Sequence, residues 1–219
     1  MAEIYLDYVA LDDADASLVK KFNDAFTGAM AGADNFGMLA SEPDPYLAHT
    51  KDIGWGSNSH KSRTGLLFYT YVTHEIDAAR TNDARRAALR YVHYVHGLNP
   101  LGLVYLSRMG DYGAARSVTQ FYHSWFTDGG DWDEVGVSKF GPPPGFLVGG
   151  PNASYNWDTG RCPSGPECGA APPSPPFGQP DLKSYAEFND GWPLNSWEVT
   201  ENSNGYQLAY IRLLSKFVN

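Results

Sequence analysis

The chain has 219 residues, of which 19% are charged and 14% are aromatic, and its formal net charge is −9. This is not the composition of a disordered or nucleic-acid-binding protein, and the negative charge disfavours a polyanionic partner. Uncharged or sugar-like partners fit better, because aromatic faces cover them without charge pairing. The sequence has no run of about 18 apolar residues, so we predict no membrane-spanning helix.

Helical periodicity dominates the first hundred residues. We predict amphipathic helices over residues 14–30, 57–79 and 84–96, with residues 81–83 as the turn and N-cap between the second and the third. The same periodicity predicts a final helix over residues 201–217.

The region between Gly97 and Asn195 has a different character, since eleven of the 15 prolines lie between Pro142 and Pro180. Loops this long inside a compact domain are usually functional or disordered, and the Trp, Tyr and Asn content here argues against disorder throughout. We therefore expect helical hairpins whose long loops gather on one rim, where a site would be built.

Two cysteines, Cys162 and Cys168, lie six positions apart in this loop region with no histidine nearby. A structural zinc site needs a fuller set of ligands, so the metal interpretation is poor. A local disulfide is favoured over two free thiols, and it would indicate an oxidising compartment.

Two aromatic segments are candidates for binding. Trp55 precedes the second helix, where Ser57 or Asn58 is expected as the N-cap; the tryptophan is either buried or a flat platform for a sugar ring. His123 stands beside Trp125 in a non-helical segment, where either a structural or a catalytic role is open to it. No second histidine or carboxylate stands at metal-ligand spacing, so no metal site is predicted.

A pair of glutamates, Glu198 and Glu201, precedes the final helix. An N-cap at Asn195 or Ser196 accounts for Glu201, because the helix macrodipole favours acidic residues in the first turn. Capping accounts less well for Glu198, because its surroundings are aromatic. The aromatic residues expected around it are Trp192, Trp197 and Tyr206. Burial against such rings raises the pKa of a carboxyl group and makes it a competent general acid near neutral pH.

Motifs for nucleophilic catalysis and for phosphate binding are absent. The sequence contains no G-x-S-x-G, no G-x-x-x-x-G-K-[ST] and no cysteine in a catalytic setting. The glycines of "LVGGPN" lead into loop sequence and not into a helix, which argues against a nucleotide site. No cofactor is therefore predicted.

Four segments, "WGSNS", "YVHGLNPLG", "PPPGFLVGGPN" and "SWEVTENSNGYQLAYIRLL", together resemble the C-terminal half of a glycoside hydrolase family 9 catalytic domain. Their order and approximate spacing match over residues 52–217, and more loosely from Asp12. This is a family of inverting cellulases with an (α/α)6 barrel. The resemblance implies an all-α fold in which helical hairpins form part of that toroid.

The resemblance also implies roles for individual residues. Glu198 matches the general acid of the family's last motif, with Val199 and Asn204 in the corresponding places. Asp190 has an offset similar to that of an Asp-Arg pair in the family, although Gly191 follows it where an Arg is expected.

Residues for binding the sugar follow from the same comparison of motifs. His123 and, less closely, Arg116 correspond to a His-His-Arg segment that contacts the sugar in the family. Trp55 falls near a position where the family presents an aromatic ring to the cleft. With Trp125 and Tyr206, these residues form the expected glucan-binding set.

The second carboxylate is harder to place. An inverting glycosidase needs one about 6.5–9.5 Å from the acid to activate water. In the family it belongs to an Asp-Ala-Gly-Asp segment, which is absent here; residues 11–17 are acidic but are interpreted as helix capping, so the chain would begin after the base. Asp190 is preferred to Glu201, which as a helical residue would share one face with Glu198. A separate segment or chain is the other source.

Residues 1–219 are thus expected to form one domain of a secreted enzyme that hydrolyses β-1,4-glucan. The alternatives are a non-hydrolytic carbohydrate-binding module without a complete carboxylate pair, and a structural helical domain whose aromatic residues all belong to the core. Half of a barrel would expose apolar helix faces. We therefore expect self-association, or a partner segment that completes the barrel.

Overall fold

The computed structural model describes residues 2–41, 44–123, 128–157 and 171–218. Its helices are α1 (Ala2–Val9), α2 (Ala16–Met30), α3 (Phe36–Ser41), α4 (Ser57–Thr73), α5 (Thr81–Val95), α6 (Trp197–Thr200) and α7 (Asn204–Leu214). Two short strands, β1 (Val104–Ser107) and β2 (Ser117–Val118), pair in parallel, and 3-10 turns lie at Met109–Tyr112 and Asp181–Lys183. The expected all-α fold of helical hairpins is confirmed.

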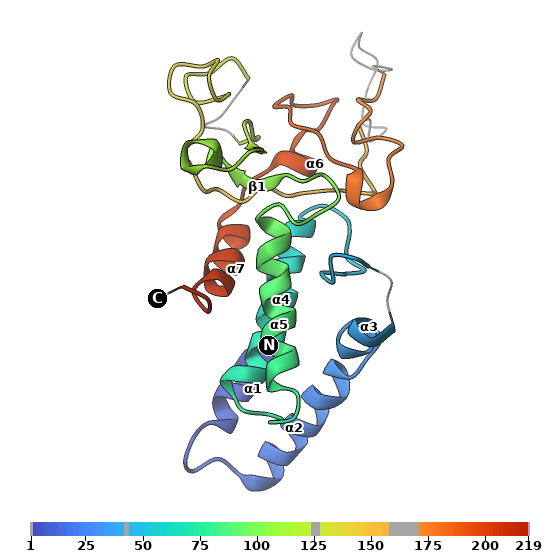
Figure 1. The fold of residues 1–219 in the computed structure, drawn as a ribbon, viewed down its shortest axis with the longest axis vertical. Coiled ribbons are helices and arrows are strands. Elements are labelled where there is room, and N and C mark those ends of the chain that lie inside the picture. The colour runs from blue at the N-terminus through green and yellow to red at the C-terminus, as the bar shows by residue number, and fades with distance from the viewer. Residues whose placement is uncertain (1, 42–43, 124–127, 158–170, 219) are drawn as a thin grey trace.

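Antiparallel helices form the centre of the molecule. α4 packs against α5 as a hairpin, α7 packs on α4, and α1 pairs with α2. Figure 1 shows the long loops, together with β1 and α6, at one end of these helices, where α5 ends and where α4 and α7 begin. The expectation that the loops gather on one rim is therefore confirmed.

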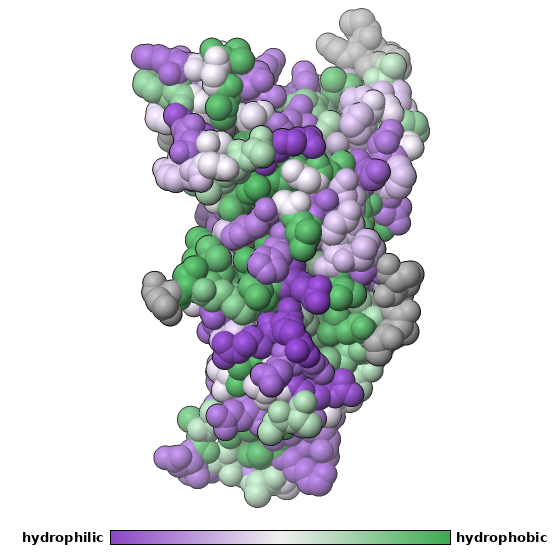
Figure 2. Space-filling view, in the orientation of Figure 1, coloured by the Kyte–Doolittle hydropathy of each residue, from purple (hydrophilic) through white to green (hydrophobic). Residues whose placement is uncertain are grey.

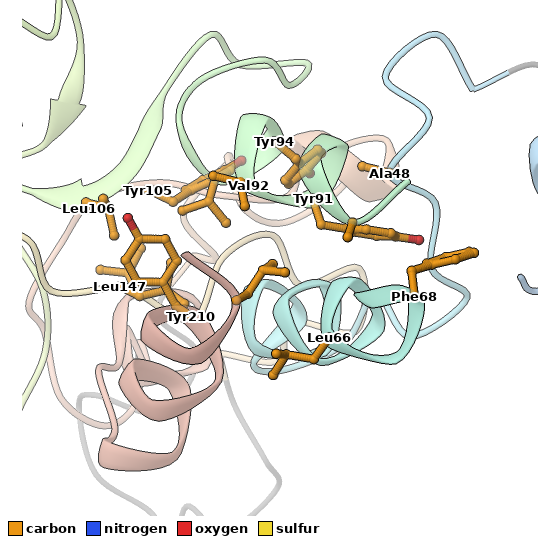
Figure 3. Close-up of a cluster of buried hydrophobic side chains, with 14 of the residues drawn as sticks. Ala48, Leu66, Phe68, Tyr91, Val92, Tyr94, Tyr105, Leu106, Leu147 and Tyr210 are labelled. Carbon is orange, nitrogen blue, oxygen red and sulfur yellow. The ribbon is translucent and has the colours of Figure 1, made fainter. Parts of the chain in front are cut away.

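The core lies where α4, α5 and α7 meet the strand β1 (Figure 3). It is rich in tyrosine: Tyr91, Tyr94 and Tyr105 are each no more than 1% exposed. Gly65 lets α4 approach its neighbours closely, because a Cβ atom there would lie 2.7 Å from a methyl carbon of Leu213. The close packing of α4 against α7 thus depends on glycine, which has no side chain, at position 65.

Several predicted helix bounds are corrected by the structure. The helix predicted over residues 57–79 ends at Thr73, because the chain turns at Glu75, whose φ is +48°. Residues 81–83 are not a turn but the first turn of α5. The final helix begins at Asn204, because Ser203 caps it by accepting a hydrogen bond from the backbone N–H of Tyr206.

The structure confirms the capping interpretation of the acidic residues 11–17 for Asp15. Asp15 is the N-cap of α2, and its carboxylate accepts from the backbone N–H groups of Ser17 and Leu18. The helices α1 and α3 were not predicted, since each is shorter than three turns and gives a weak periodic signal.

The surface in Figure 2 is hydrophilic over α5 and apolar at both sides, over α7 and near α3. No helix among the described residues is long and apolar enough to cross a membrane. Both α3 and α7 also contribute buried residues to the core of the fold.

Candidate active site

Three of the sequence motifs meet at the loop end of the molecule through backbone hydrogen bonds. The N–H of Asn58, in the first turn of α4, donates to Gly149 O over 2.9 Å. Gly149 N donates in turn to Glu201 O over 2.8 Å, and Gly150 N donates to Val199 O over 2.9 Å. The segments "WGSNS", "LVGGPN" and "WEVTEN", far apart in sequence, thus form one hydrogen-bonded unit.

Gly150 is required where these segments cross. Its φ is +93°, and a Cβ atom there would lie 2.5 Å from the side-chain amide of Asn58. That amide is buried and donates to Val148 O over 3.1 Å. A side chain at position 150 would therefore meet both backbone strain and a fixed neighbour.

Glu198 lies in α6 and is only 9% exposed. Its Oε2 accepts two hydrogen bonds, one from Asn152 Nδ2 and one from the backbone N–H of Asn156, each over 3.1 Å. Asn152 Nδ2 also donates to the backbone carbonyl of Glu198 over 3.3 Å. The carboxyl group is thereby fixed in one orientation by the loop that follows "LVGGP".

The pKa of Glu198 is raised, and burial is the main cause. The hydrogen bonds from Asn156 and Asn152 act in the opposite direction, because they stabilise the charged form. Within the described part of the chain, both of these hydrogen bonds go to Oε2, which leaves Oε1 to carry a proton. The group has the properties of a proton donor.

A second carboxyl group, that of Asp190, shares a neighbour with Glu198. Partial burial of its carboxyl group raises the pKa of Asp190, and the charges of Asp128 and Asp133 raise it further. The pKa of the Tyr155 hydroxyl is raised first by burial and then by the charges of Glu198 and Asp190. The charges of Glu198 and Asp190 therefore both act on the hydroxyl of Tyr155.

Glu201 is not helical, and this corrects the expectation that it shares a helix face with Glu198. It follows the last residue of α6, with φ −55° and ψ 138°. Its Oε2 accepts a hydrogen bond from Trp55 Nε1 over 2.9 Å. The Tyr206 hydroxyl also lies near this carboxylate, whose charge raises the pKa of the hydroxyl after burial, the main cause.

The predicted N-caps are also corrected. Gly56, with φ +79°, occupies the N-cap position of α4, and Ser57 and Asn58 are buried inside its first turn. Ser196 precedes α6 without a capping hydrogen bond from its side chain. Asn195 adopts a left-handed conformation and donates from Nδ2 to Asn156 O over 2.8 Å, which helps to fix the loop around Glu198.

The other predicted binding residues have different surroundings. His123 is exposed, and its segment contacts α6, because Tyr122 N donates to Thr200 O and the Tyr122 ring lies 5.3 Å from that of Trp197. Arg116 lines a separate cavity of about 610 Å³, whose lining does not include Glu198. Trp125, Cys162 and Cys168 lie outside the described residues.

Two partners of Glu198, Asn152 and Asn156, were not predicted, and neither was Tyr155. They lie 42 to 46 positions before it in sequence, so no local spacing connects them with the acid. The nearest signal was the "LVGGPN" segment, whose last residue is Asn152. Among the residues that the structure describes, no group of His, Cys, Asp or Glu is arranged to hold a metal ion.

Comparisons with known proteins agree on one family. The model of glycosyl hydrolase family 9 matches residues 6–214. Endoglucanase C of Cellulomonas fimi is 26% identical over 204 residues, which are 93% of this chain and 16% of that protein. A thermostable endoglucanase of Alicyclobacillus acidocaldarius (D468A variant) has a similar fold, with a TM-score of 0.69 and 18% identity over 97% of this chain and 34% of that one.

A third similar protein is AaCel9A in complex with cellobiose-like isofagomine, with a TM-score of 0.67 and 19% identity. The match covers 97% of this chain and 34% of that one. The chain therefore spans about a third of the length of these solved structures and about a sixth of the curated relative.

Proposed function

The chain belongs to glycosyl hydrolase family 9, and on this premise we propose that it hydrolyses β-1,4-glucan by an inverting mechanism in which Glu198 is the general acid. The setting of Glu198 carries the proposal. Its carboxyl group is buried, has a raised pKa and is held through Oε2 by Asn152 and Asn156. Two of the similar proteins described above are endoglucanases, and the third, AaCel9A, is in complex with a cellobiose-like isofagomine.

In the proposed reaction the Oε1–H group of Glu198 gives its proton to the glycosidic oxygen as the bond to the anomeric carbon breaks. Water attacks that carbon from the opposite face of the sugar and loses a proton to a base, which inverts the configuration. Oε2 keeps its two hydrogen bonds through the step, and these stabilise the carboxylate that forms.

Asp190 is the residue that we propose as the base within this chain. It is largely exposed, with its carboxyl group only partly buried, and it shares the neighbour Tyr155 with Glu198. Its raised pKa makes it a stronger base than an ordinary aspartate once it is ionised. Glu201 fits this role less well, because its carboxylate is already engaged by Trp55 and Tyr206.

Glucan binding is assigned to the aromatic residues at the loop end. Trp55 is 48% exposed, so part of its ring is accessible to a sugar. His123 is exposed on the segment that contacts α6, and Trp125 follows it in sequence. Arg116 would contact the glucan only beyond this unit, because it lines the separate cavity.

The proposal is tested with Glu198→Gln, which keeps the shape of the side chain and removes its proton-donating acid. Release of reducing sugar from soluble β-1,4-glucan should fall on the order of 100- to 10,000-fold, while glucan binding survives. Glu75→Gln is the matched control, since Glu75 is an exposed glutamate that lies beyond the other end of α4. Asp190→Asn should lower release in the same way.

Each outcome of this experiment has a clear meaning. Unchanged release from Glu198→Gln would remove Glu198 from the mechanism. If the unmodified chain binds glucan but releases no sugar, the chain is a carbohydrate-binding module. If it neither binds glucan nor releases sugar, both functions are excluded and the aromatic residues serve the fold.

We also infer an extracellular location, because polymeric glucan is degraded outside the cell and a Cys162–Cys168 disulfide would need an oxidising compartment. Mass spectrometry of the protein from its natural source, with and without reduction, tests this disulfide. A mass increase of about two hydrogens on reduction supports the inference, and free thiols in the native protein would oppose it.

A further inference from the structure

Glu201 connects two residues that belong to different motifs. Its Oε2 accepts the indole N–H of Trp55 over 2.9 Å, across 146 positions of sequence. The hydroxyl of Tyr206, at the start of α7, lies near the same carboxylate, whose charge acts on it. An indole has only this one hydrogen-bond donor, so the bond to Glu201 uses the whole polar capacity of the Trp55 side chain.

The backbone is shaped to permit this contact. Gly56 follows Trp55 with φ +79°, and a Cβ atom there would lie 2.6 Å from the Tyr206 hydroxyl oxygen. Only glycine lets this hydroxyl come so close to the chain at Trp55. The pKa of Tyr206 is raised to about 12, mainly by burial and then by the charge of Glu201. The Tyr206 hydroxyl therefore stays protonated beside the carboxylate at any ordinary pH.

The backbone of Glu201 is itself held in place. Glu201 O accepts from Gly149 N over 2.8 Å, inside the unit that also fixes Val199. The side chain of Trp55, by contrast, is 48% exposed. A half-exposed indole ring can rotate about its side-chain torsion angles and samples several orientations, unless a hydrogen bond to the ring N–H selects one.

We propose that Glu201 is a positioning residue, which fixes the ring of Trp55 as a platform for a sugar of the glucan chain. This inference rests on the proposed function for the identity of the ligand. The partners of Glu198 are Asn152 and Asn156, and neither Trp55 nor Glu201 is among them. Glu201 therefore sets the affinity for glucan and leaves the proton transfer to Glu198.

The first test needs neither substrate nor turnover. The indole N–H resonance of Trp55 in a ¹H–¹⁵N NMR spectrum is identified by its loss in Trp55→Phe. In Glu201→Ala this resonance should move upfield, because its hydrogen bond to a carboxylate is lost. Glu201→Gln should keep most of the downfield shift, since its side-chain carbonyl still accepts. Asp24→Ala, which removes an exposed carboxylate on α2, should leave the resonance in place.

The second test measures glucan affinity. Glu201→Ala should raise the Kd for cellohexaose and the KM for soluble glucan about tenfold, with kcat changed less than twofold, because a hydrogen bond to a charged group is lost. Glu201→Gln should restore most of the affinity. Tyr206→Phe should have a smaller effect that disappears in the Glu201→Ala background, because its hydroxyl acts through Glu201.

These tests separate the inference from the proposed function. If Glu198→Gln leaves sugar release intact, the acid assignment fails, while the indole shift and the change in Kd still support a role for Glu201. The inference is overturned if the Trp55 resonance is unchanged in Glu201→Ala. It is equally overturned if the resonance moves but the Kd for cellohexaose stays the same.

Discussion

The side-chain amide of Asn152 donates one hydrogen bond to Glu198 Oε2 over 3.1 Å and another to the backbone carbonyl of the same residue over 3.3 Å. One amide group thus fixes both the position of α6 and the orientation of its acid. Its effect on the acid is electrostatic as well, since it stabilises the charged form and lowers the pKa that burial has raised.

Removal of this amide should change the pH dependence of the reaction. In Asn152→Ala the pKa of Glu198 should rise further, because burial then acts with one opposing hydrogen bond fewer. A general acid must be protonated, so the alkaline limb of the kcat/KM profile should move to higher pH. Asn35→Ala, which removes an exposed amide bonded to Ala29 O, is the control. A shift to lower pH would contradict this account.

Glu198→Gln should also alter stability, in a direction set by the raised pKa. Between the pKa of the unfolded chain and the higher pKa of the folded protein, the native state binds more protons, so stability falls as pH rises. The neutral amide does not titrate. In urea unfolding, the variant should therefore lose less stability than the unmodified protein between about pH 4 and pH 7, and an equal slope for the two proteins would be the contrary result.

The sequence was a good guide where one segment determines its own structure. The amphipathic helix α2 was predicted to within two residues, and its N-cap was expected among the acidic residues 11–17, because periodicity and capping are local. Glu201 shows the limit of this reasoning. Its i, i+3 spacing from Glu198 suggested a shared helix face. In the structure α7 begins only after Ser203, which caps it, and the Glu201 carboxylate accepts a hydrogen bond from Trp55.

The surroundings of Glu198 show the same limit for the site. Its identity as the candidate acid followed from the motif around it. The residues that hold it come from a loop more than forty positions earlier, and only the tertiary fold brings them together. Two of the aromatic residues expected around Glu198 have partners that the sequence did not indicate, since the Trp197 ring lies 5.3 Å from that of Tyr122 and the Tyr206 hydroxyl lies near Glu201.

Gly150→Ala should destabilise the protein more than a glycine substitution elsewhere. The matched control is Gly178→Ala, because Gly178 also has positive φ, +68°, but nothing lies within 4 Å of its Cβ position. Backbone strain should cost each variant about 1–2 kcal/mol. At Gly150 the contact with the Asn58 amide adds about 1–3 kcal/mol more. Equal free energies of unfolding for the two variants would show that Asn58 moves away without cost.

Lys61 offers a prediction about the core. It is 0% exposed, its Nζ donates to Ala48 O, and it lies 4.1 Å from the centre of the Tyr94 ring. Burial lowers its pKa from 10.5 to about 8. Between these values the unfolded chain binds more protons, so stability should rise with pH, by up to about 3 kcal/mol in total.

Lys61→Met should abolish this dependence, because methionine does not titrate. Urea unfolding between about pH 8 and pH 9.5 measures the slope for both proteins, and the range stops below the titration of exposed tyrosines. Lys20→Met, at an exposed position on α2, should keep the slope of the unmodified protein. A slope that survives in Lys61→Met would have to come from another group.

The exposed face of α7 predicts association of the chain. Leu208 and Ile211 are 59% and 58% exposed, and Figure 2 shows an apolar area over this helix. Contiguous apolar surface is rarely left bare, so we expect a second copy or a further helical segment to cover it.

Sedimentation velocity at several concentrations should show an oligomer whose fraction grows with concentration. The double variant Leu208→Lys and Ile211→Lys should shift it to monomer, because a charged face cannot be buried without a partner charge. Leu98→Lys, at an equally exposed leucine outside the helices, should not. An unmodified chain that stays monomeric at every concentration would exclude self-association.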